Sequence, residues 1–78
     1  MDYIYEITGW KNGTEVQYIE TPYKAKSNAI ALQWRKSGMD AIDICKVQVG
    51  SGYLHSKFTH TLINGEWITS YTYIGEDE

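Results

Sequence analysis

A cysteine, a histidine and a carboxylate stand where they could perform thiol chemistry. Pairing of the two strands predicted in the middle of the chain would place Asp43 opposite His60. Cys45, the only cysteine among the 78 residues, would lie diagonally beside them. A thiol nucleophile needs a base, solvent access and a lowered pKa. The same pairing puts Cys45 beneath a helix, where a cysteine is usually an inert small hydrophobe. We therefore predict that Cys45 belongs to the core, that Asp43 satisfies a partly buried His60, and that the chain has no catalytic residue.

The remaining chemistry-bearing patterns do not complete a site. His55 and His60 are five residues apart, which on a strand directs them to opposite faces and places His55 on the outer face of the sheet. There is also no second cysteine to complete a metal site. The Gly-Ser-Gly at 50–52 lacks the lysine and the following helix of a phosphate-binding loop, and is typical of a turn. The sequence predicts no metal, no cofactor and no enzymatic activity.

Positive charge is concentrated in residues 22–38. This segment holds Lys24, Lys26, Arg35 and Lys36 and no acid, whereas the rest of the chain holds three lysines against all ten acids, a balance of −7. Such segregation produces a dipolar molecule, and its field orients the protein against a charged partner and speeds their encounter. We expect a partner to bind the exposed face of a helix in this segment, through Lys24, Asn28, Leu32, Arg35 and Lys36.

Two β-hairpins are predicted by the Asn-Gly pairs at 12–13 and 64–65, because each pair lies between alternating apolar segments and suits a type I′ turn. The first hairpin joins 3–11 to 14–21, and the second joins 53–63 to 66–74. Two-residue turns set the register. They pair Ile7 with Tyr18, Leu62 with Trp67, and Phe58 with Tyr71, and they place Ile7, Val16 and Tyr18 on one face and Ile19 on the other.

One helix is predicted between the hairpins. Pro22 ends the preceding strand and suits the first turn of a helix. A single stripe toward the core is formed by Tyr23, Ser27, Ile30, Ala31 and Trp34. Gly38 is a natural end for this helix.

A third strand is predicted over 41–49. A two-residue turn at 51–52 would place Cys45, Val47 and Val49 on the same face as Leu54 and Phe58. The element order is then β-β-α-β-β-β.

These elements define an α+β fold in which a single helix packs on a mostly antiparallel five-stranded sheet. A chain of 78 residues, with 42% apolar and 22% charged residues, is one globular domain of ordinary composition. We expect residues 1–74 to form this domain and residues 75–78 to form an acidic tail.

Two further surfaces are candidates for partner contacts. The outer face of the sheet carries more apolar residues than a purely solvated face, and it is a candidate for partner binding or self-association. On that face we expect Ile4, Trp10, Ile19 and Ile68. An acidic surface is formed by Glu15, Glu20, Glu66, Glu76, Asp77 and Glu78.

The sequence also bears on where the protein works. A single cysteine fits a reducing compartment, and there is no charged-then-apolar leader and no apolar run near the roughly 18 residues of a membrane span. The net charge of −3 disfavours indiscriminate binding to nucleic acid or to an anionic membrane. We expect a cytoplasmic protein without a membrane partner.

The segments 3-YIYEITGW-10, 25-AKSNAIALQW-34, 42-IDICKVQV-49 and 65-GEWI-68 give a layout that resembles small phage-encoded anti-CRISPR proteins, in which one helix packs on an antiparallel sheet. The resemblance implies a stoichiometric inhibitor that occupies a surface of a bacterial host protein or protein–nucleic acid complex, without cofactor or turnover. It transfers no site residue.

The leading hypothesis is therefore a non-enzymatic protein-binding module, a phage or mobile-element inhibitor of a bacterial defence or nucleic-acid-handling protein. One alternative is a nucleic-acid-binding domain that uses the basic helix, and its affinity would fall steeply with salt. Another is a small structural or assembly subunit that forms a homodimer through the outer face of the sheet.

Overall fold

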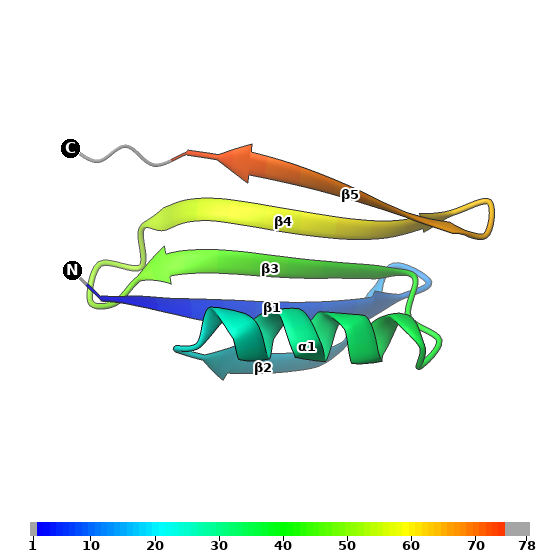
Figure 1. Cartoon of the computed structure of the whole chain (residues 1–78), viewed down its shortest axis with the longest axis horizontal. Helices are drawn as coiled ribbons and strands as arrows, with labels where there is room; N and C mark the ends of the chain where they lie inside the picture. Colours follow the sequence, from blue (N-terminus) through cyan, green and yellow to red (C-terminus); the bar gives the residue numbers. More distant parts are fainter. Residues whose placement is uncertain (1, 75–78) are drawn as a thin grey trace.

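The computed structural model describes residues 2–74 and contains five strands and one helix in the predicted order. The elements are β1 (Tyr3–Lys11), β2 (Thr14–Thr21), α1 (Lys24–Arg35), β3 (Ala41–Gln48), β4 (Leu54–Ile63) and β5 (Glu66–Tyr73). The strands form one fully antiparallel sheet in the order β2-β1-β3-β4-β5 (Figure 1). The predicted α+β fold is confirmed. Glu76, Asp77 and Glu78 lie outside the described residues.

Both predicted hairpins form at their Asn-Gly turns. Asn12 and Gly13 have φ of 53° and 78°, and Asn64 and Gly65 have φ of 51° and 81°. A type I′ turn requires positive φ at both central positions, and asparagine and glycine are the residues that adopt it most readily. The pairs of Leu62 with Trp67 and of Phe58 with Tyr71 are also as predicted.

The helix α1 packs through the predicted stripe. Ser27, Ala31 and Trp34 are buried and Ile30 is half-buried, but Tyr23 is exposed and forms the N-cap position with extended backbone geometry. The core is a cluster of Ile7, Ala31, Trp34, Met39, Ile42 and Ile44.

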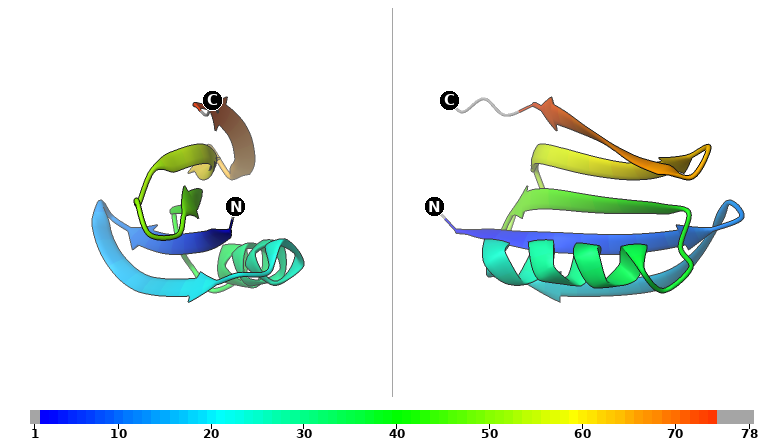
Figure 2. Two further views of the ribbon diagram at one scale, coloured as in Figure 1. Left: turned by 90° about the vertical axis from the view of Figure 1, so that its left-hand side faces the viewer. Right: turned by 45° about the vertical axis from the view of Figure 1, so that its right-hand side comes forward.

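The helix covers only part of the sheet. Among the described elements, α1 packs on β1, β3 and β2, and its backbone does not extend over β4 or β5 (Figures 1 and 2). A helix is about 10 Å wide and neighbouring strands are about 4.8 Å apart, so one helix can cover only two or three strands. The helix-side surface of β4 and β5 is therefore left open.

A β-bulge changes the register of the first hairpin. Trp10 pairs with Glu15 but Gly9 pairs with Gln17, so Val16 has no partner across the strand. Ile7 consequently lies opposite Ile19, and the predicted partner Tyr18 lies opposite Thr8 on the other face. The prediction of Ile19 on the outer face is wrong for this reason, because a shift of one residue turns every following side chain to the opposite face.

A second bulge lies at His55, between β3 and β4. Asp43 lies opposite Thr59 and not His60, and Ile44 lies opposite Phe58 on the helix side. Cys45 is therefore on the outer face, half-buried opposite Lys57, and the prediction that it lies beneath the helix is wrong.

The same bulge reverses the expected face of two further residues, Leu54 and Val47. Leu54 pairs with Val47, and Val47 lies opposite Ile4 on the outer face. Val49, predicted to end the third strand toward the core, lies in the exposed turn that follows β3. The side chains that β3 contributes to the core are those of Ile42 and Ile44.

Candidate binding groove

The uncovered helix-side surface of β4 and β5 is rich in aromatic residues. Its side chains, which we call the open face, are those of Ser56, Phe58, His60, Leu62, Trp67, Thr69, Tyr71 and Tyr73. Tyr71 is 52% exposed although its ring lies 4.6 Å from that of Phe58, centroid to centroid. Phe58 and Trp67 are half-buried against the core, whereas Tyr73, like Tyr71, is exposed. Exposed aromatic rings beside an apolar centre are typical of a binding surface.

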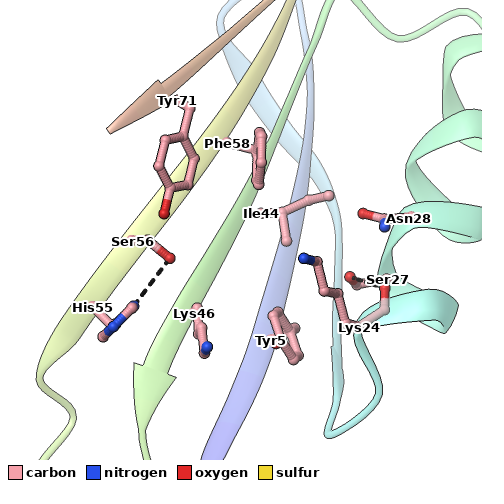
Figure 3. A pocket seen from close by; sticks show the side chains of 10 residues that line it. All are labelled: Tyr5, Lys24, Ser27, Asn28, Ile44, Lys46, His55, Ser56, Phe58 and Tyr71. Carbon is pink, nitrogen blue, oxygen red and sulfur yellow. Dashed lines mark hydrogen bonds between the residues drawn. The ribbon is translucent and has the colours of Figure 1, made fainter. Parts of the chain in front are cut away.

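A pocket of about 290 Å³ lies where the open face meets the helix (Figure 3). Its wall on the helix side includes Lys24 and Asn28, and its aromatic lining comes from Tyr5, Phe58 and Tyr71. The remaining lining residues are Ser27, Ile44, Lys46, His55 and Ser56. Two of the ten residues are lysines and none is acidic, so the pocket presents positive charge beside aromatic surface.

The two lysines of the pocket have no carboxylate partner within residues 2–74. The Lys24 amine makes no hydrogen bond or ion pair there, and in Figure 3 the side chain reaches from the first turn of α1 toward the sheet. The Lys46 amine lies 4.6 Å from the centroid of the Tyr3 ring, which is a cation–π contact. Both charges therefore remain available to an anionic group.

His55 completes the lining because its bulge turns it to the helix side. Its ring packs edge-on between those of Tyr3 and Tyr73, with centroid distances of 5.2 and 5.1 Å. The sequence predicted this histidine on the outer face, and the β-bulge is the reason that prediction is wrong.

Arg35, in the last turn of α1, contacts the open face outside the pocket. Its Nη2 donates to His60 Nδ1 at 2.8 Å and to Thr69 Oγ1 at 3.2 Å, and its guanidinium carbon lies 5.4 Å from the Trp67 ring centroid. Burial and the Arg35 charge lower the pKa of His60, which keeps Nδ1 available as an acceptor. Arg35 is thus half-buried and joins α1 to the sheet, whereas the sequence predicted it on a solvated helix face.

We call the groove the part of the open face that lies beside α1, from the pocket at Lys24 to the contacts of Arg35 with His60 and Thr69. Lys24 and Arg35 are eleven residues apart, which is about 16 Å at 1.5 Å per residue. Between them on α1, Asn28 lines the pocket, and Leu32 is 55% exposed and outside the pocket lining. Of the predicted helix-face residues, Lys24 and Asn28 line the pocket and Arg35 contacts the open face, whereas Leu32 is outside the pocket lining and Lys36 is the C-cap.

The opposite side of the sheet is acidic. Every carboxylate on the described strands projects from the outer face. These residues are Glu6, Glu15, Glu20, Asp43 and Glu66. Lys57 is the one basic strand residue on that face among residues 2–74, since it pairs with Cys45. The two faces of the sheet therefore carry opposite charge.

The predicted apolar patch on the outer face is interrupted by these acids. Ile68 is exposed there and Ile4 is half-buried, as expected from their alternation. Trp10 is on the predicted face but is half-buried, and its Nε1 donates to Asp43 Oδ2 at 3.2 Å. With Ile19 on the helix side, the patch is smaller and more polar than the sequence predicted.

The residues considered for thiol chemistry are not brought together. His60 projects on the helix side, whereas Asp43 and Cys45 project on the outer face. Burial raises the pKa of the Cys45 thiol, Asp43 and Glu6 raise it further, and Lys57 opposes them. Within residues 2–74 no three potential metal-ligating side chains come together, and no helix there is long and apolar enough to span a membrane.

No protein-family model, curated protein or solved structure matches this chain. The groove is the candidate functional site. The sequence had indicated Lys24, Asn28, Leu32 and Arg35, but it missed the open face that Lys24, Asn28 and Arg35 border. The available signal was the number of aromatic side chains on one side of the second hairpin, which exceeds what a single helix can cover.

Proposed function

We propose that this chain is a non-enzymatic protein-binding module whose groove, between α1 and the open face, contacts an acidic surface of a partner protein. The observation that carries the proposal is the presence of cations without carboxylate partners beside exposed aromatic rings, on a face whose strands hold no acid. Aromatic residues and arginine are enriched at protein interfaces, and they often dominate the binding energy.

The wider role in this proposal is inhibition. A module of this size would act stoichiometrically by occupying a surface of a bacterial defence or nucleic-acid-handling protein, in the cytoplasm of the host cell. The resemblance in size and layout to phage-encoded inhibitors supports this role, as does the segregation of charge between the two faces. The acidic outer face would remain in solvent and repel nucleic acid from that side.

The proposal is tested by capture of a partner from nuclease-treated bacterial lysate with paired variants. Tyr71→Ala and Lys24→Glu alter the groove, whereas Tyr18→Ala and Lys57→Glu make the same changes on the outer face. Tyr18 is a close match for Tyr71, because the two residues are 46% and 52% exposed. We expect the partner to be lost with the two groove variants and retained with their controls.

Loss of the partner with the outer-face variants alone would contradict the proposal. A dimer in solution that Ile68→Lys converts to a folded monomer, with no captured protein, would instead favour an assembly subunit.

A second candidate function is the binding of single-stranded nucleic acid. The observation that favours it is the position of the exposed Tyr71 ring beside Lys24 on a face without acids, because bases stack on such rings while cations follow the backbone. It predicts retention that vanishes with nuclease. With Lys24, Lys46 and Arg35 as contacts, log K should fall with log salt at a slope of about −2.

A further inference from the structure

We infer that the groove binds an extended peptide segment in which two acidic residues flank an apolar residue on the same side of the strand. This inference rests on the proposed function and specifies its ligand. The segment would place one carboxylate at Lys24 and Lys46 and the other at Arg35, with the apolar side chain over Phe58 and Tyr71.

The spacing of the cations fits an extended chain. Lys24 and Arg35 are about 16 Å apart along the helix axis. In an extended segment, residues i and i+4 project to the same side about 13 Å apart, and residue i+2 lies between them. The flexible stem of Lys24 accommodates the remaining difference. The ligand pattern is therefore acidic–x–apolar–x–acidic.

Arg35 is held ready for an anion before any ligand binds. Hydrogen bonds from Nη2 to His60 and Thr69 and the nearby Trp67 ring fix its guanidinium. Its Nε is buried without a hydrogen-bond partner, and its charge has no carboxylate partner within residues 2–74. A guanidinium fixed in this way loses little further conformational freedom when it binds, and its planar shape suits a carboxylate.

The distribution of charge favours a peptide over a nucleic-acid strand. A nucleic acid carries a phosphate at every nucleotide, so phosphates would also face the middle of the groove. The side chains of the open face itself, Phe58 and Tyr71 among them, include no cation, since Lys24, Lys46 and Arg35 come from α1 and β3. A peptide can carry charge at its two ends and an apolar side chain between them.

The inference is tested by fluorescence anisotropy with synthetic peptides and the intact protein. The probe peptide is Gly-Glu-Ala-Phe-Ala-Glu-Gly with a fluorescent label. One control exchanges Phe with the preceding Ala, which turns the ring to the opposite side of the strand, and another replaces both Glu by Lys. We expect each control to bind at least about tenfold more weakly than the probe, a difference of about 1.4 kcal/mol.

Two charge-reversal variants locate the binding. Lys24→Glu should weaken binding of the probe by about tenfold, since it replaces an attraction with a repulsion, whereas Lys57→Glu on the outer face should change it by less than about twofold. Equal binding of the probe and the reordered peptide, or equal effects of the two variants, would overturn the inference.

The inference and the proposed function can fail separately. If a lysate protein is captured through Tyr71 and Lys24 but the probe does not bind, the peptide ligand is wrong and the protein-binding module remains. If an oligothymidylate binds the groove and the probe does not, both the peptide inference and the proposed protein-binding function are wrong, and the nucleic-acid function is favoured. If the partner is insensitive to both groove variants, the proposed surface itself is wrong.

Discussion

Among single residues, His60 couples the charge of the groove to the stability of the fold. Burial and the Arg35 guanidinium lower its pKa from the ordinary value of 6.5, and Asp43 opposes them only partly. Below about pH 6.5 the unfolded chain therefore binds a proton at this residue that the folded chain does not. The unfolded state is favoured as the pH falls, so stability should decrease from pH 6.5 downward until the lowered pKa of the folded state is passed.

This prediction is checked by urea unfolding as a function of pH. His60→Gln should flatten the decrease below pH 6.5, because the glutamine does not titrate. His55→Gln is the control on the same strand and should keep the decrease. An unchanged pH profile in His60→Gln would show that other groups produce it.

Cys45 gives a second prediction at this scale. Because burial raises the pKa of its thiol, little thiolate is present at neutral pH, and alkylation by iodoacetamide should be slower than in the urea-unfolded chain. Lys57→Gln should slow the reaction further, since it removes the charge that lowers the pKa. Glu6→Gln should speed it. A rate that neither variant alters would mean that access, and not charge, governs this thiol.

Among elements, both hairpins and the register of the second one were predictable, whereas the registers of β1 with β2 and of β3 with β4 were not. The Asn-Gly turns are local signals, and they are enough to bound β1, β2, β4 and β5 within a residue. A β-bulge inserts one residue without a comparable signal. Apolar residues occur at both alternations in β2, where Val16 and Tyr18 compete with Ile19, so the pattern of apolar residues fits either register.

Which of the two registers each strand adopts depends on packing between segments that are distant in the sequence. The sequence of β3 is ambiguous in the same way, because Ile42 and Ile44 occupy one alternation and Cys45 and Val47 occupy the other. In the structure Ile42 and Ile44 fill the space beneath Trp34, and Trp10 reaches Asp43 on the opposite face. These contacts join residues far apart in the chain, which is why the sequence alone misplaced Cys45, Ile19 and His55.

The close approach of α1 to β1 predicts the effect of one substitution. A Cβ at Gly9 would overlap the side chain of Met39 and press against Trp34. Met39 is flexible, but it is buried in the core and has little space to move. Gly9→Ala should therefore lower the free energy of unfolding by about 1–3 kcal/mol, the usual range for overpacking. Urea denaturation measures it, with Thr8→Ala on the outer face as the neighbouring control.

The edge strand β5 predicts a difference between two proline variants. The Ile74 amide donates to the His55 carbonyl, so in this antiparallel pairing the even-numbered residues of β5 direct their N–H toward β4. Thr72→Pro should remove a hydrogen bond of the ladder and destabilise the protein by about 2–3 kcal/mol. Tyr71→Pro removes no hydrogen bond of the ladder, because the Tyr71 amide points away from β4.

Urea unfolding of the two variants decides this point. The Tyr71→Pro variant should be clearly more stable than Thr72→Pro, although it also loses an aromatic ring. Equal destabilisation would mean that proline acts through strain in the backbone and not through the ladder.

For the molecule as a whole, the separation of charge between the two sheet faces should govern association kinetics. The groove side carries Lys24, Lys46 and Arg35, while all the acids of the described strands lie on the outer face. An acidic ligand should therefore bind faster at low salt, and its association rate should fall several-fold as the Debye length shortens from about 30 Å to about 8 Å. Stopped-flow fluorescence with the probe peptide measures this rate.

The dissociation rate is the internal control, since screening should change it much less than the association rate. An association rate that does not vary with salt would contradict electrostatic steering by the groove.

The partial covering of the sheet explains why only half of the site was visible in the sequence. The basic helix residues follow from composition and periodicity. The open face depends on which strands of the five-stranded sheet the twelve-residue helix covers. No local sequence pattern predicts those strands. Tyr71 and Phe58 could be predicted to share a face, but not to be the pair that the helix leaves uncovered.

The bulge at Val16 also bears on how related genes would diverge. Because Val16 has no partner across the strand, loss of its codon would leave Gln17 opposite Gly9 and Glu15 opposite Trp10, and every other side chain would keep its face. Loss of a codon elsewhere in β2 would turn the residues on one side of it over. An alignment of homologous sequences should therefore place a single-residue gap in this strand at Val16.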